Sequence, residues 1–178
     1  MYLTTHAAAG VVISQHVDKP LPVLLYAFLS HFLLDFIPHG DDNVEDWARE
    51  KKRRIALVTG LDAGLLIIMI VALYGSDHLE LNRDLASAGI IGAILPDVLT
   101  FVYPAIHEKL NWFFLVRWIK KSFRVTRISP ILGFLNRRQD HLHFFIHNLP
   151  ERNLTWTQGL VFQAVLLTLF LFVGFRFR

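Results

Sequence analysis

The chain has 178 residues, of which 53% are apolar, 13% aromatic and 19% charged, and its Lys and Arg outnumber its Asp and Glu by 18 to 15. The mean hydropathy of +0.41 argues against a disordered chain, and the length suits one domain. The absence of cysteine excludes a disulfide framework, a thiolate metal site and a cysteine nucleophile. The isoelectric point near 9.4 would suit nucleic-acid binding, but the apolar segments indicate contact with a membrane surface instead.

Five apolar segments follow one another, at residues 3–17, 21–37, 55–74, 85–106 and 158–175. All except the first approach the roughly 20 residues that cross a bilayer core. The last segment has no charged residue and no helical polar stripe, which argues against the alternative, a soluble domain with buried core helices. We predict an all-α, polytopic membrane helix bundle of four or five spans, forming a single integral membrane domain over residues 1–178. The first segment either enters the membrane in part or forms the fifth span.

The connections between these segments differ in charge. Residues 41–54 contain five Lys and Arg and residues 107–157 contain nine, whereas residues 75–84 contain one Arg and three acids. The positive-inside rule therefore predicts that the first two connections are cytoplasmic and the third is external. Basic residues in the longest connection lie at helical spacing among aromatic and aliphatic ones, which predicts an amphipathic segment on the anionic inner leaflet. We expect membrane lipids as partners, and no nucleic acid.

The segment 30–42, SHFLLDFIPHGDD, interrupts an apolar span with polar residues. His31 and Asp35 are four residues apart, so a helix projects both side chains from one face, and His39 follows four positions later. Imidazole and carboxylate groups at this spacing bind one zinc-like ion or bridge two. The alternative, a polar helix end solvated at the interface, explains His39. It does not explain His31 and Asp35, because ionisable groups are costly within an apolar span.

Depth within the spans connects further residues to this motif. Counted from cytoplasmic ends at residues 39, 55 and 106, Asp35 and His31 lie four and eight residues inside, Asp62 seven and Asp97 nine. At about 1.5 Å per residue, these side chains lie roughly 6 to 14 Å below the cytoplasmic boundary. His6 joins them if segment 3–17 crosses the membrane. We therefore predict a shared metal site with ligands from His6, His31, Asp35, His39, Asp62 and Asp97.

Two of these acids have simpler interpretations, which stay open. Pro96 breaks a helix, so Asp97 would cap the backbone amides that the break frees. Gly60 and Gly64 permit close helix approach, so Asp62 would form a hydrogen bond with a neighbouring helix. Considered together with the histidine–aspartate motif, the two acids favour a metal site.

A third polar cluster, RRQDHLHFFIHN, occupies residues 137–148. One interpretation is a lid that adds metal ligands or binds a phosphate through its arginines. The other is an interfacial segment whose histidines face water. The candidate substrate-binding residues of this cluster are Arg137, Arg138, His143 and His147.

Three short motifs are similar to those of known proteins: the early histidine of TTHAAAG, the Pro-Asp of GAILPDVL, and HFLLDFIPH. Through them, about the first hundred residues resemble the bacterial and archaeal membrane-bound metal-dependent hydrolases, which are related to zinc-dependent phospholipase C. Leu99 stands where that family usually has a second acid, and the family's later His-Arg-Gly-x-Thr-His signature is absent. The resemblance implies a prokaryotic inner membrane protein with a divalent metal cofactor. The ligand types favour zinc and leave manganese and iron open.

The principal hypothesis is a membrane-embedded, metal-dependent hydrolase that acts on a phosphoester or lipid at the cytoplasmic leaflet. The metal would activate a water molecule, and a spare carboxylate would act as general base. One alternative is a proton or metal-ion transporter or channel subunit that uses the intramembrane His and Asp residues. Such proteins favour midplane sites with two-sided access, whereas the predicted polar groups lie near one face. A second alternative is a noncatalytic scaffold with a closed, structural metal site.

Overall fold

The computed structural model describes residues 2–39, 52–75, 81–102 and 154–174, together with positions 138, 141, 142 and 145. All regular structure within these residues is helical, which confirms the predicted all-α class for this part of the chain. The elements are α1 (Leu3–Ser14), α2 (Pro20–Asp35), α4 (Lys52–Gly75), α5 (Arg83–Asp97), the π-helix η1 (Val98–Val102) and α8 (Trp156–Gly174).

The helices coincide with the five apolar segments predicted from the sequence. Proline at the first position of α2 is compatible with a helix start, because the first turn has no intrahelical use for its missing N–H. The side chain of Asn82 caps α5 by accepting hydrogen bonds from the backbone amides of Asp84 and Leu85. The segment 107–157, predicted to be amphipathic and interfacial, lies outside the described residues except for positions 138, 141, 142, 145 and 154–157.

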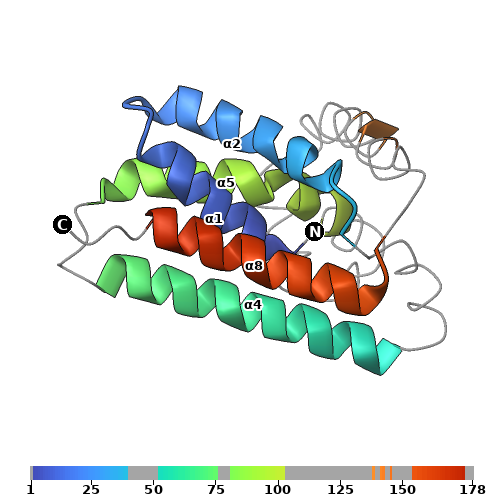
Figure 1. Ribbon diagram of the computed structural model, residues 1–178. Coiled ribbons are helices and arrows are strands. Elements are labelled where there is room, and N and C mark those ends of the chain that lie inside the picture. Colours follow the sequence, from blue (N-terminus) through green and yellow to red (C-terminus); the bar gives the residue numbers. More distant parts are fainter. Residues whose placement is uncertain are drawn as a thin grey trace, which may run out of the picture.

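The short helix α1 lies at the centre of the described structure and contacts α2, α4, α5 and α8. Figure 1 shows α1, α4 and α8 running in one direction and α2 and α5 in the other. Eight consecutive residues of α1, numbers 4–11, are buried. Helix α1 is therefore enclosed by its neighbours, and its small residues allow them to approach closely.

Glycines bring the backbones of these helices into contact. A Cβ atom on Gly10 of α1 would collide with the carbonyl oxygen of Gly89 of α5, and the reverse is also true. A Cβ atom on Gly92 would collide with the carbonyl oxygen of Leu24 in α2. Small residues at helix crossings are typical of membrane proteins, in which packing rather than hydrophobic burial drives helix association. These two crossings fix α1 and α2 against α5.

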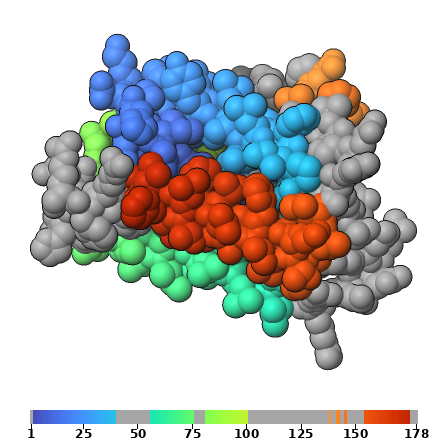
Figure 2. All heavy atoms as spheres, in the orientation of Figure 1, coloured from blue at the N-terminus to red at the C-terminus, as the bar shows by residue number. Residues whose placement is uncertain are grey.

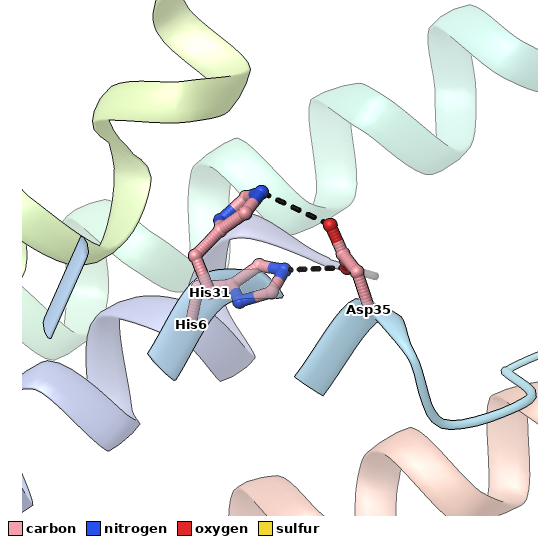
Figure 3. Close-up of side chains that lie close together, drawn as sticks. All are labelled: His6, His31 and Asp35. Atoms are coloured by element: carbon pink, nitrogen blue, oxygen red, sulfur yellow. Dashed lines mark hydrogen bonds and ion pairs between the residues drawn. The ribbon is translucent and has the colours of Figure 1, made fainter. Parts of the chain in front are cut away.

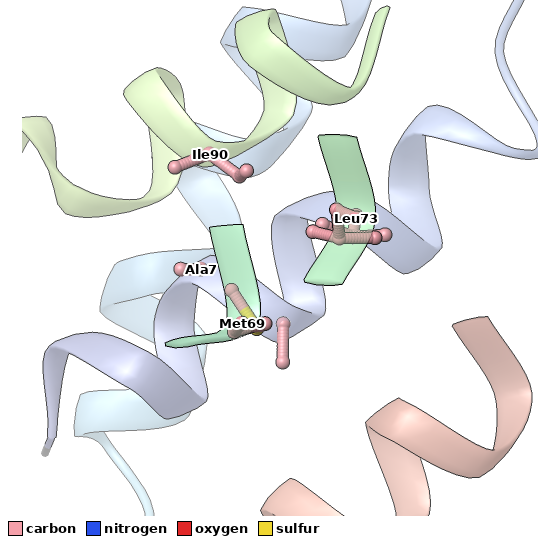
Figure 4. Close-up of a cluster of buried hydrophobic side chains, with 6 residues drawn as sticks. Ala7, Met69, Leu73 and Ile90 are labelled. Carbon is pink, nitrogen blue, oxygen red and sulfur yellow. The ribbon is translucent and has the colours of Figure 1, made fainter. Parts of the chain in front are cut away.

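The apolar core lies between α1, α4 and α5. Figure 4 shows Ala7, Met69, Leu73 and Ile90 within it, and Ala8 and Val11 complete the cluster. Alanine side chains on α1 leave room for the longer side chains of α4. This cluster packs α1, α4 and α5 together, and the rest of the described interior includes polar side chains.

Many of the larger apolar side chains point outward, whereas many buried side chains are polar. Leu21, Leu25, Leu29 and Leu33 form an exposed stripe along α2, with Leu33 70% exposed. Figure 2 shows α2 and α8 on the surface of the molecule. The buried polar residues are Thr4, Thr5, His6, Ser14, His31, Asp35, His39, Asp62, Asp97, Thr100 and Gln163. Among the buried residues that the structure describes, these 11 polar or charged side chains accompany 13 hydrophobic ones, whereas the buried positions of a water-soluble protein are predominantly apolar.

Two of the described helices are long and apolar enough to cross a membrane. These are Ala56–Gly75 within α4 and Trp156–Gly174, and only 17% of each apolar window is buried. They correspond to the predicted segments 55–74 and 158–175. The predicted segments 3–17 and 21–37 form the shorter apolar helices α1 and α2, and the described part of the predicted span 85–106 forms most of α5 together with η1.

Candidate metal centre

The centre of the site is a histidine–aspartate pair on one face of α2. His31 and Asp35 are one helical turn apart and fully buried, and His31 Nε2 lies 3.0 Å from Asp35 Oδ2. The buried face of the helix continues towards its start with Ala27 and Val23, also at spacings of four. Small and polar residues thus face the interior while the leucine stripe faces outward. The spacing of four residues therefore places the site residues on one face of α2 and the leucine stripe on the opposite face.

His6 reaches the same carboxylate from α1. Its Nε2 atom lies 3.1 Å from Asp35 Oδ1, so each carboxylate oxygen faces one imidazole. The rings of His6 and His31 stack with centroids 4.0 Å apart and planes inclined by 24°. Figure 3 shows the two rings on the same side of Asp35. The glycine crossings of α1 and α2 with α5 make this approach possible, because a larger residue at either crossing would separate the helices.

A backbone hydrogen bond determines which nitrogen of His31 faces the carboxylate. Nδ1 lies 2.8 Å from the carbonyl oxygen of Ala93 in α5. A carbonyl only accepts, so Nδ1 carries the hydrogen, and Nε2 of the neutral ring presents its lone pair towards Asp35. Metal-binding histidines commonly donate their second ring N–H to a backbone carbonyl in this way. The arrangement is suited to a cation between Nε2 and the carboxylate.

The donor set fits a small divalent ion. One ligand atom from each of His6, His31 and Asp35 can be chosen so that all three lie within 4.8 Å of one another. Ligand atoms around tetrahedral zinc are about 3.3 Å apart, given bond lengths of about 2.0–2.1 Å. The separations of 3.0 Å from His31 Nε2 to Asp35 Oδ2 and of 3.1 Å from His6 Nε2 to Asp35 Oδ1 are near this value, and each involves a different carboxylate oxygen. Two imidazoles and one carboxylate would leave a fourth position open, as in catalytic zinc sites.

Asp97 lies at the edge of this group. Its Oδ1 atom is 3.7 Å from His31 Nε2, and its side chain is 12% exposed, compared with 0% for His31. It is the last residue of α5, directly after Pro96 and directly before the π-helix η1. Interruptions of this kind occur frequently at functional sites. Asp97 is therefore a carboxylate at the edge of the His6, His31 and Asp35 group, next to His31.

Asp62 and His39 are near the site but have other contacts. Asp62 Oδ2 accepts a hydrogen bond from the amide of Leu3, and Asp62 Oδ1 accepts from the amide and hydroxyl of Thr4. The hydrogen bond to a neighbouring helix that was one interpretation of Asp62 is therefore present, although it does not depend on close contact at Gly60 or Gly64. His39 directs Nδ1 to the carbonyl oxygen of Ile37, at 2.6 Å. Neither residue belongs to the three-residue group.

Two polar residues that form hydrogen bonds around the site, Gln163 and Thr4, were not identified from the sequence. Gln163 of α8 accepts a hydrogen bond from the amide of Tyr2 at 2.7 Å and donates one to the carbonyl oxygen of His39 at 3.2 Å. Thr4 contacts Asp62, as described above. The available signals in the sequence were Gln163, an amide within the apolar segment 158–175, and Thr4, two residues before His6.

The predicted cluster at residues 137–148 lies mostly outside the described residues. Arg138 and His141 are helical and exposed. Arg137, His143 and His147 lie outside the described part of the chain, so their predicted role in substrate binding stays a prediction.

Comparison of the chain with protein-family models, curated proteins and solved structures found no match. The interpretation of the site therefore depends on its own geometry.

Proposed function

We propose that this protein is an integral membrane protein in which α2, α4, α5 and α8 cross the bilayer and α1 lies within it, enclosed by the other helices. The many buried polar side chains and the exposed leucine stripe of α2 support this proposal, because lipid tails rather than water are suited to such a stripe. The alternating helix directions in Figure 1 also suit successive crossings. Helix α1, at 12 residues, would span only about 18 Å, but its neighbours enclose it and shield it from lipid.

We further propose that the site lies at the cytoplasmic end of the helices. Helix α4 begins with Lys52, Arg53 and Arg54, at the end where α2 and α5 finish and the site lies (Figure 1). By the positive-inside rule, this end would face the cytoplasm of a prokaryotic cell. The site would then lie within reach of the inner-leaflet headgroups.

The function that the geometry supports best is metal-dependent hydrolysis of a phosphoester, with a lipid headgroup as the natural substrate at this depth. The observation that carries it is the buried group of His6, His31 and Asp35 beside the more exposed Asp97. A divalent ion, zinc by preference, would polarise a phosphoryl oxygen and lower the pKa of a bound water. His6, His31 and Asp35 would hold the ion, and Asp97 would accept the proton from the attacking water.

A transporter or channel subunit is the alternative use of buried His and Asp residues. Transport needs polar groups along a path that opens on both sides. Among the described residues, the buried ionisable side chains gather at one end of the helices, and the opposite end contributes Ser14 as a buried polar residue. This one-sided distribution favours a pocket that admits and releases a substrate at the same face.

The proposal is tested by hydrolysis assays on the purified protein in detergent and in liposomes. The substrates are a chromogenic phosphodiester and phospholipid vesicles, with and without added zinc or manganese. We expect the wild type to hydrolyse the substrate and a chelator to abolish this activity. Asp97→Asn should lower the hydrolysis rate by about 10²–10⁴-fold while retaining the metal. His16→Gln, a control at an exposed position, should leave the rate unchanged. Proton or ion flux without hydrolysis in the metal-loaded protein would instead support the transporter.

A further inference from the structure

The side chain of Asp62 is fully engaged by the first turn of α1. Its Oδ2 atom accepts from the amide of Leu3 at 2.8 Å, and its Oδ1 atom accepts from the amide of Thr4 at 3.2 Å. The Thr4 hydroxyl lies 2.6 Å from Oδ1 and 2.9 Å from the Asp62 carbonyl oxygen, and it can donate to one of them at a time. Asp62 is 7% exposed and Thr4 3% exposed. One carboxylate therefore binds several donors in a buried setting.

This contact is a helix cap supplied by a different helix. The first amides of any helix lack intrahelical partners, and no side chain at the N-cap position of α1 supplies one. Asp62 lies six residues after Ala56, where the apolar part of α4 begins, which is about 9 Å along the helix. At that depth in a bilayer, water would not satisfy these amides, so a protein acceptor is needed. A carboxylate also interacts favourably with the positive end of the helix dipole.

The cap fixes the part of α1 that carries His6. His6 follows Thr4 by two residues in the same turn, and its ring must reach both Asp35 and His31, on α2. We propose that Asp62 is a positioning residue: it holds the first turn of α1 so that His6 completes the metal centre, and it does not itself bind the metal. This inference rests on the proposed metal centre and gives Asp62 a role different from the ligand role predicted from its depth.

Zinc affinity of the full-length protein in detergent micelles separates the two roles. Thr4→Val removes one donor without changing the shape of the side chain. We expect it to lower zinc affinity by up to about tenfold, the equivalent of one hydrogen bond, and Thr4→Ser to retain wild-type affinity. Asp62→Asn keeps an acceptor and should act similarly, whereas Asp62→Leu should lower affinity by about 10–100-fold, as is usual for groups that orient metal ligands.

The effects of Thr4→Val and Asp62→Leu should be less than additive in the double variant, because both changes remove the hydrogen bond between the Thr4 hydroxyl and the Asp62 carboxylate. The hydroxyl can still donate to the backbone carbonyl of residue 62 in Asp62→Leu alone. Complete loss of zinc in Asp62→Asn, together with unchanged affinity in Thr4→Val, would overturn the proposal and identify Asp62 as a ligand. Unchanged affinity in both Asp62→Leu and Thr4→Val would also overturn it.

A metal-free measurement keeps this inference separate from the proposed function. The ring signals of His6 are followed by NMR in ¹⁵N-histidine-labelled protein without metal. They should shift in Asp62→Leu and Thr4→Val, while those of the exposed His16 stay in place. Ser14→Ala is the matched control, because its hydroxyl donates within α1 to the carbonyl of Val11. Failure of the wild type to bind zinc would contradict the proposed function alone, whereas unchanged His6 signals in Asp62→Leu would overturn the positioning role.

Discussion

The imidazole ring of His6 stacks on that of His31, with ring centroids 4.0 Å apart, although the two residues belong to different helices. Both side chains are completely buried. Two imidazolium cations at this separation would repel strongly where little water screens them. The neutral form of an imidazole is the one that binds a metal. The stacking is thus compatible with a shared ion beside Asp35.

Asp35 is the residue on which the metal centre depends most. Asp35→Asn keeps the size of the side chain but removes its negative charge, and both histidines face this group. Loss of a group that only orients a metal ligand lowers metal affinity by up to about 100-fold. Because Asp35 would bind the ion directly, we expect Asp35→Asn to lower zinc affinity by more than this. Competition with a chromophoric chelator measures this change. Asp18→Asn, at an exposed position, is the control and should bind zinc as the wild type does.

Metal binding should weaken as the pH is lowered. Protons and metal ions compete for the same nitrogen atoms of His6 and His31, and the ion binds only to the deprotonated atoms. Zinc affinity should therefore fall at a pH low enough to protonate these nitrogen atoms. Titration with zinc at several pH values measures this change. A zinc affinity that stays constant down to the pH at which the protein unfolds would contradict histidine ligation.

The glycine crossing between α1 and α5 should be intolerant of a methyl group. Gly10→Ala would place its Cβ against the carbonyl oxygen of Gly89, so α1 must move away from α5. Overpacking of this kind costs about 1–3 kcal/mol, and the shift would also carry His6 away from Asp35. Thermal unfolding and zinc content are measured on the same sample.

Gly64→Ala is the matched control for that experiment. A Cβ atom at Gly64 would meet nothing within 4 Å in the described part of the chain. Alanine is favoured over glycine within a helix by about 1 kcal/mol, so this variant should be as stable as the wild type or slightly more stable. Equal effects of the two alanine variants would contradict the close crossing at Gly10.

Gln163 should stabilise the junction between α8, the start of α1 and the end of α2. Gln163→Leu removes two hydrogen bonds, one from the amide of Tyr2 and one to the carbonyl oxygen of His39. The expected cost is about 0.5–1.5 kcal/mol for each hydrogen bond. Thr168→Val is the control on the same helix, because its hydroxyl bonds to the carbonyl of Ala164 within α8. A similar unfolding temperature for both variants would show that the Gln163 contacts add no stability.

The exposed leucine stripe tests the membrane proposal. Leu29 lies near the middle of α2 and is 57% exposed. Within a bilayer, Leu29→Arg should cost about 2.5–3.5 kcal/mol and reduce the amount of protein inserted into the membrane. Leu29→Ala should insert normally. In a water-soluble protein an exposed arginine would be tolerated, so wild-type levels of Leu29→Arg in a soluble fraction would contradict the proposal.

The helices could be predicted from the sequence because each apolar segment carries its own signal. Lengths and charges placed the helices to within a few residues, and spacing placed His31 and Asp35 on one face. The crossings at Gly10 and Gly89 could not be predicted, because they depend on how two distant helices rotate about their axes. Such crossings decide which polar residues meet.

The contacts of Asp62 could not be predicted from the sequence for the same reason. Depth along the span placed it level with the other acids, but depth does not show which neighbouring helix it faces. In the structure it faces the first turn of α1, whose unsatisfied amides are invisible in a pattern of residue types. Gln163 was missed for a similar reason, since its partners are backbone groups of residues 2 and 39.

Elemental analysis of the purified wild-type protein and of the His31→Ala, Asp35→Ala double variant tests the central claim most directly. The account predicts a stoichiometric amount of zinc, or of manganese or iron, in the wild type and its loss in the double variant. Circular dichroism of both proteins must show the same helix content. A well-folded wild type that carries no metal, even after reconstitution with zinc, manganese or iron, would contradict the metal centre and with it the hydrolase.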